Sequence, residues 1–136
     1  MQLTLESEYA VRIIYVISGE STGEKKRMDA RSISDVSGVP LRFSLKILRK
    51  LVGGGFVRSY KGTRGGYELA KEPSEISMLD VVELIEGPIH INRCVAGDFI
   101  CTRTKEEPCE FKKCFNEVSE EIRNSLKGFT FDRFIG

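Results

Sequence analysis

The sequence predicts a mostly α-helical protein with one small β-hairpin, in which a winged helix-turn-helix DNA-binding domain precedes a long C-terminal dimerisation helix. Three observations predict this fold class. Two helical patterns meet at a short turn, residues 37–39, and the second pattern has a cationic face. A glycine-rich hairpin pattern follows directly, and the last helical pattern is long and amphipathic.

The first two helices are predicted from apolar spacing and from end signals. Residues 5–18 repeat apolar side chains at helical intervals, and a loop rich in glycine and charge follows at 19–26. A short second helix is expected after Asp29, which can cap it, and should run to about Ser37, where Gly38 closes it. Ile33 and Val36 should face inward. The apolar positions of the first helix are Tyr9, Ala10, Ile13, Ile14, Val16 and Ile17.

The third helix is expected from Pro40, which suits a first helical turn, to about Val52. Its inward side should hold Phe43, Ser44, Ile47, Leu48 and Leu51. Its opposite side should hold Arg42, Lys46, Arg49 and Lys50, with Leu45 at the edge. Because a short turn joins the second and third helices, they should form a helix-turn-helix with a cationic outer face. An ordinary amphipathic pair with a basic solvent side is the alternative.

The hairpin that follows has the composition of a wing. Residues 56–60 and 67–70 are predicted strands, and 61–66 is the turn between them. The turn carries Lys61 and Arg64, and Arg64 at its tip is placed to enter a minor groove. Its glycines would let the backbone approach a phosphate closely. A plain surface hairpin is the alternative.

The charge distribution indicates nucleic acid. Residues 24–71 hold twelve Lys and Arg against four Asp and Glu, a local net charge of +8. The rest of the chain holds nine basic and sixteen acidic residues, a net charge of −7. Neutralising phosphates requires clustered cations rather than a high average charge, and a solvated basic surface is the alternative.

The C-terminal half is predicted to hold two further helices. Ser77 and Asp80 resemble a capping box that opens a helix to about Glu86, with Leu79, Val82 and Leu84 or Ile85 apolar. Residues 89–110 should form a loop, and the last helix covers about 110–127. We expect its apolar stripe to pack on a partner copy, with packing inside one chain as the alternative. The stripe is Phe111, Phe115, Val118, Ile122 and Leu126.

The chain therefore divides into three expected parts. Residues 1–88 form the winged helix-turn-helix DNA-binding domain, 89–110 the cysteine-bearing sensor loop, and 111–136 the C-terminal dimerisation helix and tail. The N-terminus has no secretory signal pattern, and the longest apolar run, 13–17, is far too short to cross a bilayer. We expect a cytoplasmic protein with no membrane partner. Motifs for catalysis are missing from the sequence, so we expect neither enzyme activity nor a small-molecule substrate.

All four cysteines lie in one segment, with the spacing Cys94-x6-Cys101-x7-Cys109-x4-Cys114. In a reducing compartment they are thiols or metal ligands rather than a disulfide framework. Zinc sites usually pair cysteines two to four residues apart, and these wider gaps suit a loop around a larger object. Loop thiols that bind nothing, or that react with peroxide or persulfide, are the alternative.

The order of these motifs resembles a known family. Met1, Leu3 and Thr4 with residues 9–12, then residues 33–51, 59–62, 65–70, 76–88 and 129–131, match the pattern of the Rrf2-type winged helix-turn-helix transcriptional regulators, the family of IscR, NsrR and CymR. The Gly65–Gly66–Tyr67 wing sequence and the Glu86–Gly87–Pro88 ending are the most specific parts. The resemblance implies a homodimer on a partly palindromic double-stranded operator, with a recognition helix at 40–52 and a wing at 61–66.

The resemblance also implies a cofactor. Three cysteines placed like Cys94, Cys101 and Cys109 hold an iron–sulfur cluster in some relatives, of either the 2Fe-2S or the 4Fe-4S type. The position of a histidine ligand in one relative is Lys112, which cannot serve. Other relatives use a carboxylate of the opposite subunit, which matches Glu8. Cys114 is a second candidate fourth ligand, although on the apolar stripe a cysteine is more often a small core residue. The lone histidine, His90, is expected to be solvated.

Two residues depart from the family pattern. Ser44 stands where leucine is usual, and Leu45 stands where cluster-sensing members often carry a base-contacting glutamate. Leucine can contact a thymine methyl but cannot accept a hydrogen bond from cytosine. The expected DNA contacts are Arg31, Pro40, Arg42, Leu45, Lys46, Arg49, Lys50, Ser59, Lys61, Arg64 and Gly65.

The leading hypothesis is a dimeric DNA-binding repressor or activator that senses iron supply, redox state or nitric oxide through the cluster. A cluster-free winged-helix regulator that senses through thiols or a partner protein is the first alternative. A structural zinc-binding module for protein–protein contact is the second, although the wide cysteine spacing and the basic helix with its wing disfavour it.

Overall fold

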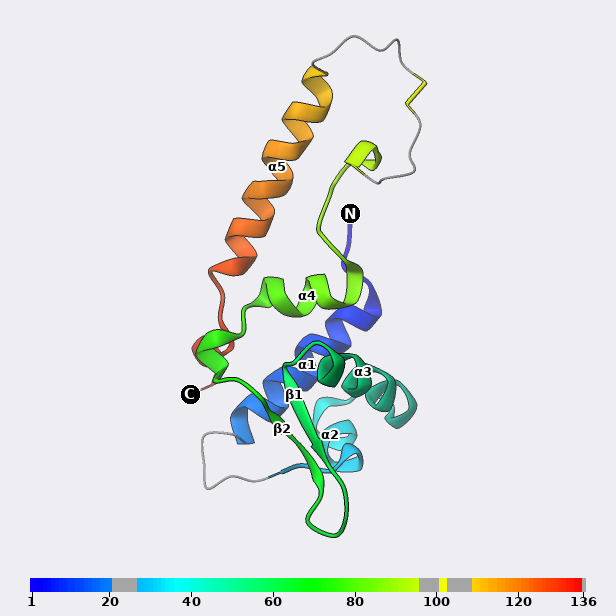
Figure 1. The fold of residues 1–136 in the computed structure, drawn as a ribbon, viewed down its shortest axis with the longest axis vertical. Coiled ribbons are helices and arrows are strands. Elements are labelled where there is room, and N and C mark those ends of the chain that lie inside the picture. Colours follow the sequence, from blue (N-terminus) through cyan, green and yellow to red (C-terminus); the bar gives the residue numbers. More distant parts are fainter. Residues whose placement is uncertain (21–26, 96–100, 103–108, 136) are drawn as a thin grey trace.

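The computed structural model describes residues 1–20, 27–95, 101–102 and 109–135, and confirms the predicted fold class (Figure 1). Five helices and one hairpin follow in the predicted order among these residues, and three short 3-10 turns lie before α4, between α4 and α5, and after α5. The helices are α1 (Leu5–Glu20), α2 (Ala30–Ser37), α3 (Leu41–Gly53), α4 (Met78–Glu86) and α5 (Glu110–Lys127), and the strands are β1 (Val57–Tyr60) and β2 (Gly66–Leu69).

Helices α1 to α4 pack around one apolar core, while the hairpin and α5 project from it in opposite directions (Figure 1). Helix α1 lies at the centre and contacts α2, α3 and α4. The predicted inward residues Ile13, Ile14 and Ile17 of α1 are fully buried, as are Ile47, Leu48 and Leu51 of α3. The periodicity of these two helices therefore identified the centre of the core correctly, although Tyr9 and Val16 are only half-buried.

The second helix begins and ends as predicted. The Asp29 carboxylate accepts a hydrogen bond from the Ser32 backbone N–H at 2.8 Å, and Gly38 closes the helix in the left-handed conformation, at a φ of 75°. The inward placement of Val36 was wrong, because its side chain is 67% exposed. This eight-residue helix buries Ile33 against α1 and α3, and Val36, about 60° round the helix axis, lies outside that contact.

The inward placement of Phe43 was also wrong. This residue lies at the edge of the face with which α3 packs on the core, rather than inside it. Its side chain is 46% exposed, and its ring lies 6.0 Å from that of Tyr9, measured between centroids. Pro40 also lies just before the first helical residue rather than within the first turn. The buried side of α3 is therefore narrower than its apolar stripe.

The hairpin pairs antiparallel, with Val57 opposite Leu69 and Tyr60 opposite Gly66. Met28 forms an isolated antiparallel bridge to β2 that the sequence did not indicate. Its backbone exchanges two hydrogen bonds with Tyr67, at 3.0 and 2.8 Å. Gly66 has a φ of 135°, and a Cβ there would lie 2.8 Å from the Met28 carbonyl oxygen. Packing within the chain therefore requires this glycine, independently of any approach to a phosphate.

The C-terminal half has the predicted helices and one additional contact. The capping box of Ser77 and Asp80 opens α4, and α5 covers residues 110–127 as expected. Beyond α5 the chain returns to the core, where the Met78 N–H donates to the Phe129 carbonyl oxygen (2.7 Å) and Phe131 is buried. Within the described residues, no helix combines the length and apolar character needed to cross a membrane.

Candidate nucleic-acid interface and cysteine segment

The expected DNA contacts on α2 and α3 lie on the surface. Arg31, Pro40, Arg42, Lys46 and Arg49 are exposed. Leu45 is 41% exposed, so its side chain is available to a base edge. Lys50 is the member of the α3 set that is only half-exposed.

The turn between α2 and α3 is fixed by two hydroxyl groups. The Ser44 side chain, which is fully buried, donates to the Val39 carbonyl oxygen at 3.1 Å, and Ser34 donates to the same oxygen at 2.6 Å. This carbonyl would otherwise lie inside the turn with no helical partner. Ser44 therefore has a structural role that a leucine at this position could not fill.

An acidic residue of α1 lies against the lysines of α3. Glu6 Oε1 lies 2.8 Å from Lys50 Nζ and 3.7 Å from Lys46 Nζ. The hydrogen bond from Lys50 lowers the pKa of the Glu6 carboxyl from its ordinary value, so the group is ionised at neutral pH. Two of the four α3 cations therefore share one carboxylate, a contact that sequence reasoning missed because residues 6 and 50 are far apart in the chain.

The wing presents its predicted residues to solvent. Ser59, Lys61 and Arg64 are exposed, while Gly65 is half-buried because it packs against the Tyr60 and Lys61 backbone.

Arg27 is a further wing residue that the sequence analysis did not select. Its guanidinium carbon lies 3.4 Å from the centroid of the Tyr60 ring, and Nη1 donates to the Arg64 carbonyl oxygen at 3.2 Å. Arg27 is exposed, so it adds a cation beside the hairpin and also connects to its tip. Its position in the basic stretch 24–71 was a signal, but charge alone could not show which residue reaches the wing.

The four cysteines are free thiols outside the core. Cys94 is half-buried in the 3-10 turn Arg93–Val95, where the side-chain amide of Asn92 donates to its sulfur. Cys101 is exposed, and Cys109 is half-buried just before α5. Residues 96–100 and 103–108, which complete the expected sensor loop, lie outside the described residues. Among the described residues, no three metal-binding side chains converge on one point.

Among the described residues, the candidate fourth ligands also do not lie close to these cysteines within one chain. Glu8 is exposed on α1, and His90 is exposed as expected. Cys114 is exposed, which contradicts its interpretation as a small core residue within the chain. The physical reason is that, among the described residues, the stripe carrying it has no covering element at this end of α5, unlike the stripe of α3.

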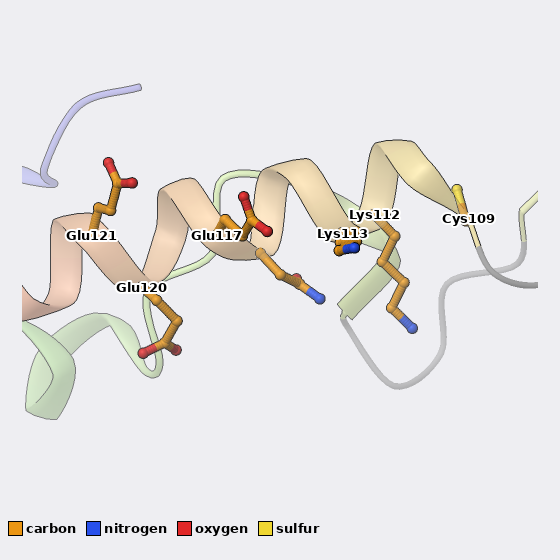
Figure 2. Close-up of a pocket in the computed structure, with 7 residues that line it drawn as sticks. Cys109, Lys112, Lys113, Glu117, Glu120 and Glu121 are labelled. Atoms are coloured by element: carbon orange, nitrogen blue, oxygen red, sulfur yellow. The ribbon is translucent and has the colours of Figure 1, made fainter.

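The outer face of α5 is a charged surface rather than an enclosed site. A shallow hollow there is lined by Cys109 with six side chains of the same helix (Figure 2). In Figure 2 lysines lie next to Cys109, and glutamates occupy the following turns. Because all of them belong to one helix and its N-cap, this face cannot surround a small molecule.

The apolar face of α5 is exposed in its first half and half-buried in its second half. Phe111, Phe115 and Val118 are 64%, 42% and 38% exposed. Near the other end, Ile122 and Leu126 line a groove of about 550 Å³ together with the N-terminal residues and segment 86–91. The Arg123 guanidinium holds α5 to α4 by donating to Glu83 at 2.8 Å. An exposed apolar stretch such as Phe111, Phe115 and Val118 is typical of a helix that packs on another chain.

The sequence and the fold of this chain are both similar to those of known proteins. A family model described as "Rrf2: Iron-dependent Transcriptional regulator" matches residues 3–136. A putative HTH-type transcriptional regulator of Aquifex aeolicus is 32% identical over 103 residues, which are 76% of this chain and 72% of that protein. The chain spans 54% of the length of two further regulators.

Two solved structures share the fold. The global cysteine regulator CymR (YrzC) of B. subtilis superposes with a TM-score of 0.76 at 21% identity, covering 97% of this chain and 94% of that one. IscR of T. potens superposes with a TM-score of 0.76 at 20% identity, covering 97% and 84%.

Proposed function

The chain belongs to the Rrf2 family of transcriptional regulators, and from this premise we propose that it binds a double-stranded operator as a homodimer. The relatives it matches are regulators rather than enzymes, as the sequence predicted. One observation carries the DNA-binding part of the proposal. The exposed cations of α3 and the exposed cations of the hairpin tip belong to two elements joined by only a few residues.

Each element would contact DNA in its own way. Helix α3 would lie in a major groove, where Arg42, Leu45 and Arg49 face base edges or phosphates. The wing would reach the flanking minor groove with Arg64, while Lys61 neutralises a phosphate. Lys46 and Lys50 would contact phosphates. The other members of the proposed contact set are Arg31, Pro40, Ser59 and Gly65.

Dimerisation would proceed through the α5 stripe. Single-chain packing leaves Phe111, Phe115 and Val118 exposed, and burying such a stripe against a second copy contributes roughly 25 cal/mol per Å² of apolar surface. A dimer presents two copies of α3 to a partly palindromic site. We keep the division of the chain into a DNA-binding domain (1–88), a sensor loop (89–110) and a dimerisation helix with tail (111–136) as part of this proposal.

We further propose that Cys94, Cys101 and Cys109 hold an iron–sulfur cluster. Their chemistry fits, because all are free thiols that pack no core, and the Asn92 amide already donates to the Cys94 sulfur as cluster sulfurs require. The three cysteines do not converge on one point within the described chain, so holding one cluster would require them to move closer together. When bound, the cluster would supply sensitivity to iron, redox state or nitric oxide. Glu8 of a partner copy or Cys114 would complete the ligand set.

A cluster-free regulator is the second candidate function. The exposed thiols of Cys101 and Cys114 favour it, because solvent-accessible cysteines are open to reaction with peroxide or persulfide. This alternative predicts DNA affinity that is independent of iron.

The decisive experiment uses protein purified and reconstituted without oxygen. We expect a coloured protein with bound iron and sulfide, and a palindromic duplex recovered from a random pool by selection. Each of Cys94→Ser, Cys101→Ser and Cys109→Ser should abolish the visible spectrum. Glu8→Gln and Cys114→Ser distinguish the fourth ligand, because only the true ligand should shift the spectrum. A colourless protein that still selects a duplex would favour thiol sensing, and a protein that selects none would end the DNA-binding proposal.

A further inference from the structure

Glu6 of α1 forms ion pairs with two lysines of the candidate recognition helix, α3. Its Oε1 lies 2.8 Å from Lys50 Nζ and 3.7 Å from Lys46 Nζ. The two lysines are one helical turn apart on α3, and Glu6 reaches them from the first turn of α1. The three side chains are 40%, 56% and 26% exposed for Lys50, Lys46 and Glu6.

The contact affects how α3 would meet phosphate. A lysine ammonium that donates one N–H to a carboxylate at 2.8 Å has part of its charge neutralised, and only its remaining N–H groups are available to a phosphate oxygen. The carboxylate also repels phosphate, and at 26% exposure it is less screened than a fully solvated acid. Arg42 and Arg49 of the same helix have no such carboxylate partner among the described ion pairs.

We propose that Glu6 competes with DNA phosphate for Lys46 and Lys50, and so lowers the affinity of the protein for duplexes of any sequence. This inference rests on the proposed DNA-binding function and adds a residue that sets the overall affinity for DNA. Phosphate contacts supply most of the non-specific affinity, whereas base contacts supply sequence discrimination. Because phosphate contacts contribute to the binding of any duplex, restraining two lysines lowers the affinity for operator and for non-specific DNA by similar factors.

The test compares Glu6→Gln with the wild type on a selected operator and on a scrambled duplex of equal length. Glutamine keeps the size and the acceptor oxygen but removes the charge. We expect affinity for the scrambled duplex to rise several-fold and the slope of log K against log salt to steepen by about one unit. Affinity for the operator should rise by a similar factor, so the ratio of the two affinities stays nearly constant, as expected for contacts with phosphate rather than with bases. Glu20→Gln, an exposed acid at the other end of α1, is the matched control and should change neither quantity.

A double-mutant cycle shows whether Glu6 acts through its lysine. Lys50→Met should weaken binding to the scrambled duplex only slightly in the wild type and clearly more in the Glu6→Gln background. Equal effects in both backgrounds, or unchanged or weaker binding by Glu6→Gln, would overturn the inference. Thermal unfolding of each variant verifies that the fold is retained. A wild-type protein that binds no duplex at low salt would instead remove the proposed function itself.

Discussion

Helices α3 and α5 are both amphipathic, yet the described chain buries the apolar face of α3 and leaves much of the apolar face of α5 exposed. Helix α3 buries Ser44, Ile47, Leu48 and Leu51 under α1, α2 and α4. Helix α5 is longer, but among its residues only Ser119 is buried, and it contacts chiefly α4. An apolar stripe predicts that a helix face will be covered, but it does not say whether the cover comes from the same chain.

The largest expected difference between the two helices is in stability. Ile47→Ala should lower the free energy of unfolding by about 3 kcal/mol, because the side chain is fully buried and its removal leaves a cavity. The same substitution at Ile122, which is half-buried, should cost roughly 1 kcal/mol in dilute protein and more at high concentration. Denaturant unfolding over a range of concentrations measures both. A concentration-independent effect at Ile122 would contradict the dimer proposal.

The next effect concerns assembly. Phe115→Asp should leave the chain folded, because this side chain is 42% exposed and makes no core contact, but should render it monomeric. Operator affinity should fall about 100-fold, because a monomer binds only one half-site. Asn124→Asp adds the same charge to an exposed polar position of α5 and should remain dimeric. Sedimentation and fluorescence anisotropy measure these outcomes.

Substitution of one arginine on α3 and one on the wing tests whether both elements contact DNA. Arg42→Ala on α3 and Arg64→Ala on the wing should each weaken operator binding roughly tenfold, as loss of a base or groove contact does. Arg49→Ala should flatten the salt slope by about one unit, whereas Lys50→Met should change it less because Glu6 already holds that lysine. Unchanged affinity for both arginine variants at low and moderate salt would remove them from the interface.

Arg27 should have a smaller effect, because it acts beside the wing tip. Arg27→Ala removes the contact with the Tyr60 ring and the hydrogen bond to the Arg64 carbonyl oxygen, and should weaken operator binding about threefold. In an Arg64→Ala background the further loss should be smaller if Arg27 positions that residue. Additive losses would indicate that Arg27 contacts DNA independently.

The smallest expected effect is a pH dependence of the α4–α5 contact. The hydrogen bond from Arg123 lowers the pKa of the Glu83 carboxyl below its ordinary value of 4.5, so the pair stabilises the fold at neutral pH. This contribution is lost as the pH falls through the lowered pKa. Glu83→Gln should melt about 2 °C lower than wild type at pH 7, and the two should converge at acid pH once the Glu83 carboxyl is protonated. Glu120→Gln, at the more exposed partner of Arg123, should show little of this difference.

The sequence by itself determined the helices, the hairpin, their order and most of their buried faces. These features depend on local interactions: the Ser77–Asp80 capping box, the left-handed Gly38, and apolar residues at helical spacing such as Ile13 and Ile47. Caps and periodicity act within a few residues, so they can be recognised without the fold. Val36 and Phe43 are exceptions, because each belongs to the apolar stripe of its helix but lies outside the part of the stripe that neighbouring helices cover.

Only the tertiary structure decided which functional residues meet. It placed Glu6 against Lys46 and Lys50, Met28 beside Tyr67, Arg27 over Tyr60, and Phe131 in the core. It also showed that the described cysteines do not converge within one chain. These contacts join residues far apart in sequence, whose proximity depends on how helices pack. The sequence could therefore identify the cations of α3, but only the fold distinguishes those that an acid holds from those that are free to bind DNA.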